Sequence, residues 1–329
     1  MQTSNPKQEK LTKWLDKALE HHKKGELDRA QVLYKKILDK DKKNTDASHL
    51  LGVICFAKKN HNRACQLIET AVKQAPNIGM YRYNLALNLV EVCRTDEAIL
   101  HLMSAIDNDP KYIQSYRLLG CIYITKNKLE HAKRAIKQGL SIEPNNSLLL
   151  ETKASILEKE GHLKEALDIY HGLLTVTPQN EVALNNMGHI HSQLGNFNEA
   201  QKLLKTLLEI NPQHIQAHNN LGNIALCQFK LEEAKSHFIK AIEIDNDFLL
   251  AKLNLATCYR LGEEYELAIQ EFNIIIRQVK EKTTKIEDDQ QTYDKAIVGL
   301  SICLVNTCQW QEYQILKDNV IELCNNSKS

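Results

Sequence analysis

Asparagine recurs at one position of the sequence, at intervals that are multiples of 34 residues. Asn84, Asn186, Asn220 and Asn254 share this position. A side-chain amide carries both a hydrogen-bond donor and an acceptor, so it can bond both polar groups of a peptide backbone. A ladder of such amides predicts binding of an extended protein segment. With neighbouring asparagines included, the expected peptide-binding residues are Asn84, Asn185, Asn186, Asn219, Asn220, Asn223 and Asn254.

Other residues that could support chemistry form weaker patterns. His214 and His218 are four residues apart and would share a helix face, but the sequence offers no evident third metal ligand. Cys303 and Cys308 lack the spacing of metal ligands. The sequence contains no glycine-rich phosphate loop, no HExxH and no GxSxG. We therefore expect no enzyme activity from this chain, no catalytic residue, no metal and no cofactor.

The composition is that of a folded protein with no charge preference. Of 329 residues 43% are hydrophobic and 25% charged, and the net charge is +1, so the whole chain gives no electrostatic case for nucleic acid. The first 44 residues carry 12 Lys/Arg and 7 Asp/Glu, which fits a solvated helix face. The sequence predicts no signal peptide and no membrane span. Nine scattered cysteines without a CxxC pair favour reduced thiols in the cytoplasm.

The 34-residue interval extends well beyond asparagine. Counting places 1 to 34 from residue 11, place 8 is always small, place 24 is large and apolar, and proline is frequent at place 32. No insertion interrupts the count between residues 11 and 282, which holds eight units. Alanine occupies place 20 of every unit, at Ala30, Ala64, Ala98, Ala132, Ala166, Ala200, Ala234 and Ala268.

The spacing within a unit predicts a helix, a turn and a second helix. In the sixth unit we expect helices at about 181–194 and 198–209, with Gly195 in a left-handed conformation at the turn. The small residue at place 8 and the alanine at place 20 would face each other where the helices cross. Proline at place 32 would stop the second helix. One unit cannot bury its apolar face alone, so stacking must supply the core.

This pattern resembles the tetratricopeptide repeat over about four-fifths of the chain. NNMGHIHSQLGNFNEAQKLL at 185–204 is a strong match, whereas Lys42 replaces proline in the first unit and Lys153 is unusual in the fifth. The resemblance implies an all-α fold, a right-handed α-solenoid of helix-turn-helix units. We expect a disordered tail at 1–10, eight units at 11–282, and a polar linker with capping helices at 283–329, where 280–295 combines a helix end with a loop.

A second resemblance rests on Cys303-Leu304-x-x-x-Cys308-x-Trp310-x-Glu312-Tyr313. This motif is similar to the junction between the repeats and the catalytic half of O-GlcNAc transferases, the SPINDLY-like family. That family commonly has Asp before the tryptophan, where this chain has Gln309. The resemblance implies that the chain could be the substrate-recruiting arm of such a glycosyltransferase, with the sugar-nucleotide domain absent after Ser329. The alternative is an ordinary cap with buried Cys and Trp.

The patterns together predict a non-enzymatic scaffold that binds a protein or peptide in its concave groove, chiefly in units six to eight. The ladder is interrupted in units one, two, four and five. The N-terminal units, with His49, Phe56, Tyr83 and Arg117, could instead bind an amphipathic helix. The basic side chains with which related co-chaperones clamp a terminal carboxylate are missing. We expect no nucleic acid and no membrane as partners, and the sequence leaves a homo-oligomer open.

Overall fold

The computed structural model describes residues 6–281 and 287–326, and within those ranges the secondary structure is α-helical, without a strand. The chain divides into two compact parts, each of several 34-residue repeats: the first unit is residues 1–162 and the second unit is residues 163–329. The division falls between the two helices of the fifth predicted repeat. The first unit contains α1 (Pro6–Lys23), α2 (Leu27–Lys40), α3 (Thr45–Ala57), α4 (His61–Gln74), α5 (Gly79–Glu91), α6 (Thr95–Asn108), α7 (Ile113–Thr125), α8 (Leu129–Ile142) and α9 (Ser147–Lys159). The second contains α10 (Leu163–Val176), α11 (Glu181–Gln193), α12 (Phe197–Ile210), α13 (Ile215–Cys227), α14 (Leu231–Ile244), α15 (Leu249–Leu261), α16 (Tyr265–Glu281), α17 (Glu287–Asn306) and α18 (Trp310–Asn326).

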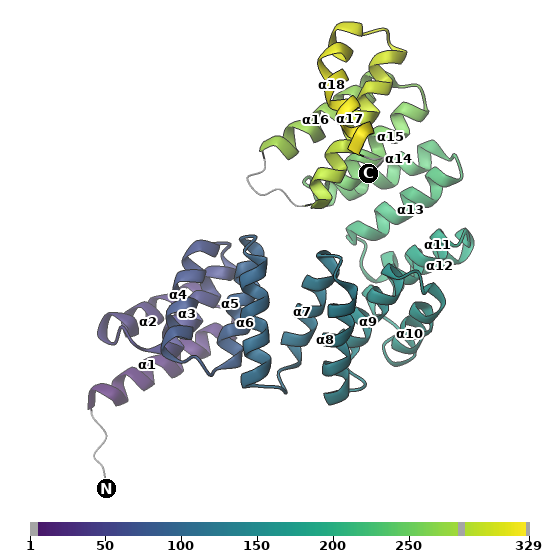
Figure 1. Cartoon of the computed structure of the whole chain (residues 1–329). Coiled ribbons are helices and arrows are strands. Elements are labelled where there is room, and N and C mark those ends of the chain that lie inside the picture. The colour runs from purple at the N-terminus through teal and green to yellow at the C-terminus, as the bar shows by residue number, and fades with distance from the viewer. Residues whose placement is uncertain (1–5, 282–286, 327–329) are drawn as a thin grey trace. The chain divides into compact units, whose positions relative to one another are not determined.

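The helix bounds repeat with the sequence period. Figure 1 shows the successive helices of each of the two parts. From α3 to α15 every first helix has 13 residues and covers places 1–13. From α2 to α14 every second helix has 14 residues and covers places 17–30. The two helices predicted for the sixth repeat are therefore confirmed to within one residue at each end.

A left-handed residue at place 15 ends the first helix of every repeat. Gly25, Gly161 and Gly195 have φ of 75°, 81° and 76°, where glycine is the least strained residue. The other five repeats place a non-glycine residue in this conformation, with φ between 52° and 61°. The stacked helices therefore impose the turn whatever residue occupies it. Those residues are Lys59, Cys93, Asn127, Phe229 and Glu263.

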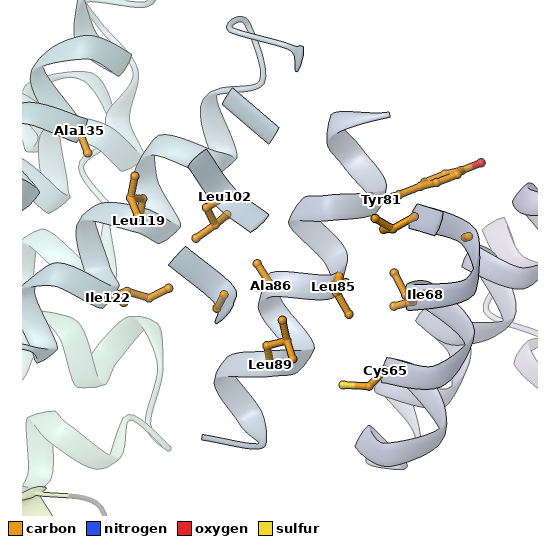
Figure 2. Close-up of a cluster of buried hydrophobic side chains, with 13 residues drawn as sticks. Cys65, Ile68, Tyr81, Leu85, Ala86, Leu89, Leu102, Leu119, Ile122 and Ala135 are labelled. Atoms are coloured by element: carbon orange, nitrogen blue, oxygen red, sulfur yellow. The ribbon is translucent and has the colours of Figure 1, made fainter. Parts of the chain in front are cut away.

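The core of the first unit is shared between successive repeats. Figure 2 shows one cluster in which Ile68 of α4, Leu85 and Leu89 of α5, Leu102 of α6 and Leu119 of α7 converge. All but Leu119 are at most 1% exposed. Because side chains from three consecutive repeats close one cluster, no single helix pair could bury this surface alone.

The small residue at place 8 packs directly under the large residue at place 24. A Cβ atom added to Gly222 would lie 2.5 Å from Cε1 of Phe238, and one added to Gly52 would lie 2.5 Å from Cγ1 of Ile68. The backbone carbonyl of Ala64, at place 20, would be 3.3 Å from the same Gly52 Cβ. The predicted close approach at place 8 is present, but its main contact is the place-24 side chain.

A helical glycine outside this contact gives the first testable prediction. Gly172 lies on the exposed face of α10, and a Cβ there would meet nothing within 4 Å. We expect Gly172→Ala to raise the free energy of unfolding by roughly 0.5–1 kcal/mol, because alanine loses less backbone entropy in a helix. Urea unfolding followed by circular dichroism would measure it, and a loss of stability would contradict the open environment of Gly172.

Both ends of the chain differ from expectation. Helix α1 begins at Pro6, so residues 6–10 are helical rather than part of a disordered tail; proline suits a first helical position because its missing N–H is not needed there. Helix α17 begins at Glu287, so most of the predicted 280–295 loop is helical. An amphipathic helix needs only one face against the core, and Tyr293 of α17 packs there. The rest of both predictions, residues 1–5 and 282–286, lies outside the described residues.

The last two helices cover the eighth repeat. Phe272 of α16 packs with Ile297, Leu300 and Cys303 of α17, each at most 3% exposed. Cys308, between α17 and α18, has φ of 59°, so these helices use the turn of the repeats. Trp310 is 54% exposed, which differs from a cap with a buried tryptophan.

None of the described helices is long and apolar enough to cross a membrane. The eight cysteines whose side chains the structure describes are all free thiols, and burial raises the pKa of the Cys258 thiol to about 11.

Candidate functional site

Six of the seven predicted asparagines lie in the second unit, on the first helices of three successive repeats. Asn185 and Asn186 belong to α11, Asn219, Asn220 and Asn223 to α13, and Asn254 to α15. Asn219 is only 4% exposed, and the other five are partly exposed. The seventh, Asn84, belongs to α5 of the first unit.

The first asparagine network joins the sixth repeat to the seventh. The Asn220 amide donates to Oδ1 of Asn185 over 3.1 Å, and the Asn185 amide donates to Oδ1 of Asn186 over 3.1 Å. The Asn186 amide donates in turn to the hydroxyl of Tyr170 on α10, at 2.8 Å. Each of these groups therefore fixes the orientation of the next one.

The second network joins the seventh repeat to the eighth. The Asn254 amide nitrogen is 3.0 Å from Oδ1 of Asn219 and 3.0 Å from Oδ1 of Asn223, so it donates to both. This arrangement uses both N–H groups of Asn254. Buried Asn219 acts only as a support for Asn254 in these bonds.

One geometric rule relates these contacts. A residue at place 5 accepts from the asparagine at place 6 of the next repeat, 35 residues later, in Asn185–Asn220 and Asn219–Asn254. The first unit contains the same contact between His49 and Asn84, with 2.7 Å between His49 Nε2 and Asn84 Nδ2. His49 is 2% exposed and stacks on Tyr81 with 4.3 Å between ring centroids. Burial lowers the pKa of His49 to about 4, which keeps Nε2 free to accept.

The networks leave defined polar atoms for a ligand. Asn220 uses its N–H group on Asn185, and its Oδ1 has no partner among the described residues. Asn223 uses its Oδ1 on Asn254, and its N–H groups have no partner in the described part of the chain. An acceptor and a donor thus lie one helical turn apart on α13, the pair that a backbone peptide group requires.

A pocket of about 430 Å³ opens beside these two side chains. Asn220, Asn223 and Cys227 of α13 form one wall, and α11 with the start of α12 forms the other. The second wall includes His189, Ser192, Gln193 and Phe197. Two of the predicted asparagines, Asn220 and Asn223, therefore line a hollow in the surface.

The histidine pair does not form a metal site. Nδ1 of His214 accepts from the backbone N–H of Ala217 at 3.1 Å and so caps α13, the role that Asn180 performs one repeat earlier. Nε2 of His218 is 3.1 Å from the Pro212 carbonyl, to which it donates, and its Nδ1 is 3.4 Å from His237. Within residues 6–281 and 287–326, no group of three or more His, Cys, Asp or Glu could hold a metal ion.

Several residues of the site were not predicted from the sequence. Tyr170 completes the first network, and His189, Gln193, Phe197 and Cys227 line the pocket. The 35-residue offset between place 5 and place 6 is a sequence signal that could have predicted the asparagine pairs. The pocket has no such signal, because it depends on side chains from both helices of one repeat and the first helix of the next.

Comparisons with known proteins agree with the repeat. Models of the tetratricopeptide repeat match residues 21–83, 113–146 and 179–247, which together cover half of the chain. A tetratricopeptide repeat protein from Parabacteroides merdae superimposes with a TM-score of 0.67 at 17% identity, over 75% of this chain and 98% of that one. The Cut9–Hcn1 hetero-tetramer of the APC/C gives 0.62 at 15% identity, over 73% of this chain and 48% of that one. At such identities the likeness shows the fold.

Two of the curated relatives are longer proteins that match this chain over part of its length. The Drosophila melanogaster protein O-mannosyl-transferase Tmtc3 is 26% identical over 132 residues, which are 40% of this chain and 14% of the fly protein. The BBSome complex member BBS4 of Bos taurus is 27% identical over 146 residues, 44% of this chain and 28% of that protein. The chain thus spans less than a third of the length of either relative.

Proposed function

The chain belongs to the tetratricopeptide-repeat family, and from this premise we propose that it is a non-enzymatic scaffold that binds an extended segment of another protein along α11, α13 and α15. The observation that carries the proposal is the oriented pair on α13, with the free Oδ1 of Asn220 beside the free N–H groups of Asn223. A backbone N–H would donate to Asn220, and a backbone carbonyl would accept from Asn223.

Preorganisation supports this proposal. Asn185 and Asn219 hold the amides of Asn220 and Asn254 in place, so a bound segment would not have to order those side chains. The contacts are directed at backbone groups and would accept many sequences. The BBSome relative is named as a member of a complex, and that too favours a role in protein association.

The test removes the place-6 amides together. We expect Asn186→Ala, Asn220→Ala and Asn254→Ala combined to weaken binding about tenfold or more, because each lost bond contributes roughly 0.5–1.5 kcal/mol. Unstructured 12-residue peptides displayed on phage would first be selected on the native chain. Their affinities for both proteins would then be measured by fluorescence anisotropy. Unchanged affinities would refute the proposal.

A second variant separates binding from folding, because the triple substitution also breaks the internal networks. Asn223→Leu removes the Asn254–Asn223 bond but leaves the Asn185–Asn220 and Asn219–Asn254 bonds in place. The third repeat already carries leucine at this position, as Leu87. We expect it to bind the selected peptides severalfold more weakly while helicity and melting temperature hold. A variant that keeps its fold and its affinity would exclude Asn223 from the site.

A second candidate function is the substrate-recruiting arm of a glycosyltransferase. The specific observation in its favour is the similarity to a fly protein named as an O-mannosyl-transferase, together with the Cys308–Trp310 motif that resembles O-GlcNAc transferases. An antibody against this chain would measure the mass of the native protein in cells. A mass near 37.6 kDa would refute an arm joined to its catalytic half in one chain, and a much larger mass would favour it.

A further inference from the structure

The pocket beside Asn220 and Asn223 has a composition that restricts what can enter it. The residues that line it include imidazole, hydroxyl and amide side chains, one phenyl ring and one thiol, but no Lys, Arg, Asp or Glu. A carboxylate or ammonium group that entered would lose part of its water without a Lys, Arg, Asp or Glu side chain to pair with, which is unfavourable. The pocket therefore favours an uncharged group.

Its size and walls favour an aromatic ring. At about 430 Å³ the pocket is larger than a small aliphatic side chain would fill, and Phe197 offers a ring for edge or offset contact. Phe197 is only partly buried where it packs against the core shared by the sixth and seventh repeats, which leaves part of it accessible.

The polar groups of the pocket favour a ring that also carries a hydroxyl. Ser192 and Gln193 line the pocket from α11, whereas Asn220 and Asn223 line it from α13. Gln193 contacts His189 through its amide nitrogen, at 3.0 Å, and that contact leaves its carbonyl oxygen as an acceptor. A phenol can donate to such an acceptor and accept from the Ser192 hydroxyl, whereas a plain phenyl ring would leave both without a new partner.

We propose that this pocket is a side-chain subsite for tyrosine in the bound segment. It rests on the proposed function, since Asn220 and Asn223 would hold the backbone of the residue whose phenol enters the pocket. The ring would lie against Phe197, and the hydroxyl would reach Ser192 and Gln193. The subsite would add selectivity to a ladder that otherwise recognises only backbone groups.

Cys227 allows the pocket to be tested without any peptide. Its thiol is exposed and lines the pocket, so disulfide-linked fragments can be placed there and retained according to their fit. The probes are 4-hydroxyphenethyl, phenethyl, 4-carboxyphenethyl and 4-(aminomethyl)phenethyl disulfides, each in competition with mercaptoethanol. Tryptic mass spectrometry would locate each adduct. Cys93 and Cys308 are internal controls, because both are exposed thiols in turns outside the pocket.

The phenol should be retained at Cys227 against about fivefold more mercaptoethanol than the phenyl fragment, and against about tenfold more than either charged fragment. Phe197→Leu should reduce this retention, and Gln193→Leu should remove the difference between phenol and phenyl. Cys93 and Cys308 should show no such order. Equal retention of the four fragments at Cys227, or the same order at all three thiols, would overturn the proposal.

The experiment also distinguishes the subsite from the groove. If Cys227 selects the phenol but the triple asparagine variant keeps its peptide affinity, the pocket stands and the backbone groove falls. If the triple variant loses affinity but Cys227 shows no selection, the groove stands without the tyrosine subsite. Failure of both would refute the site as a whole.

Discussion

Phe238→Ala is expected to lower the free energy of unfolding of the second unit by about 3–5 kcal/mol, the range for removing a buried phenyl ring. Phe238 is fully buried in α14, and its cluster joins α13, α14 and α15 through Ala225, Leu255 and Cys258. Because only helix neighbours share this cluster, the damage should be concentrated in the seventh and eighth repeats. Hydrogen exchange by mass spectrometry would locate it.

The chain supplies a matched control for this substitution. Phe229 lies nine residues earlier, in the turn before α14, and it is 78% exposed. We expect Phe229→Ala, the same chemical change, to alter the free energy of unfolding by no more than about 0.5 kcal/mol. Comparable losses for the two phenylalanines would contradict the burial that distinguishes them.

The contact between Gly222 and Phe238 makes the prediction sharper. A methyl group on Gly222 would lie 2.5 Å from the Phe238 ring, which is fully buried and has little room to move away. Gly222→Ala alone should therefore destabilise the unit, by roughly 1–3 kcal/mol. In the Phe238→Ala background the same methyl group would enter the vacated space, so the sign of its effect should reverse. A double-mutant cycle with no coupling would exclude this contact.

The sequence period predicted the backbone closely because it reports on contacts that every repeat must make. A helix pair needs a small residue at place 8, alanine at place 20 and a left-handed residue at place 15, and these needs recur every 34 residues. The loop predicted within residues 280–295 was wrong, because a polar stretch can be helical when one face of the helix packs against the core. In α17, Tyr293 makes that contact.

The sequence pattern identified the asparagines, but it did not predict which atoms their side chains hydrogen-bond. Whether a side-chain amide is free to bond a ligand or bonds a neighbouring amide depends on the distance between adjacent repeats. That distance cannot be read from the sequence. Asn220 and Asn254 donate to their neighbours, whereas Asn223 keeps its N–H groups. Whether the remaining atoms hold a peptide stays a prediction. A hydrogen bond contributes little net free energy, so small changes in spacing decide between partners.

His49 gives the first unit a pH dependence that the asparagine pairs lack. Its Nε2 accepts from Asn84 and must be unprotonated to do so. Burial lowers its pKa from 6.5 to about 4, with nearby Asp46 opposing the shift and His22 adding to it. Above pH 6.5 the imidazole is neutral in both the folded and the unfolded chain. Below that pH the unfolded chain binds a proton that the folded chain resists until about pH 4, so stability falls as the pH falls.

The expected loss from His49 is about 2 kcal/mol between pH 7.5 and pH 5, out of roughly 3 kcal/mol for the full shift. His49→Asn should remove this pH-dependent loss of stability. Asparagine can replace His49 there, because repeats six and seven carry asparagine at the same place and pair it with the next repeat. Urea unfolding would be followed by the fluorescence of Trp14, which packs in the same cluster as α3. The other tryptophan, Trp310, would be changed to Phe in both proteins. An equal loss of stability in both proteins would show that the pH dependence comes from other groups. A smaller loss in the variant would identify His49 as a place-5 residue that holds the asparagine only while it is uncharged.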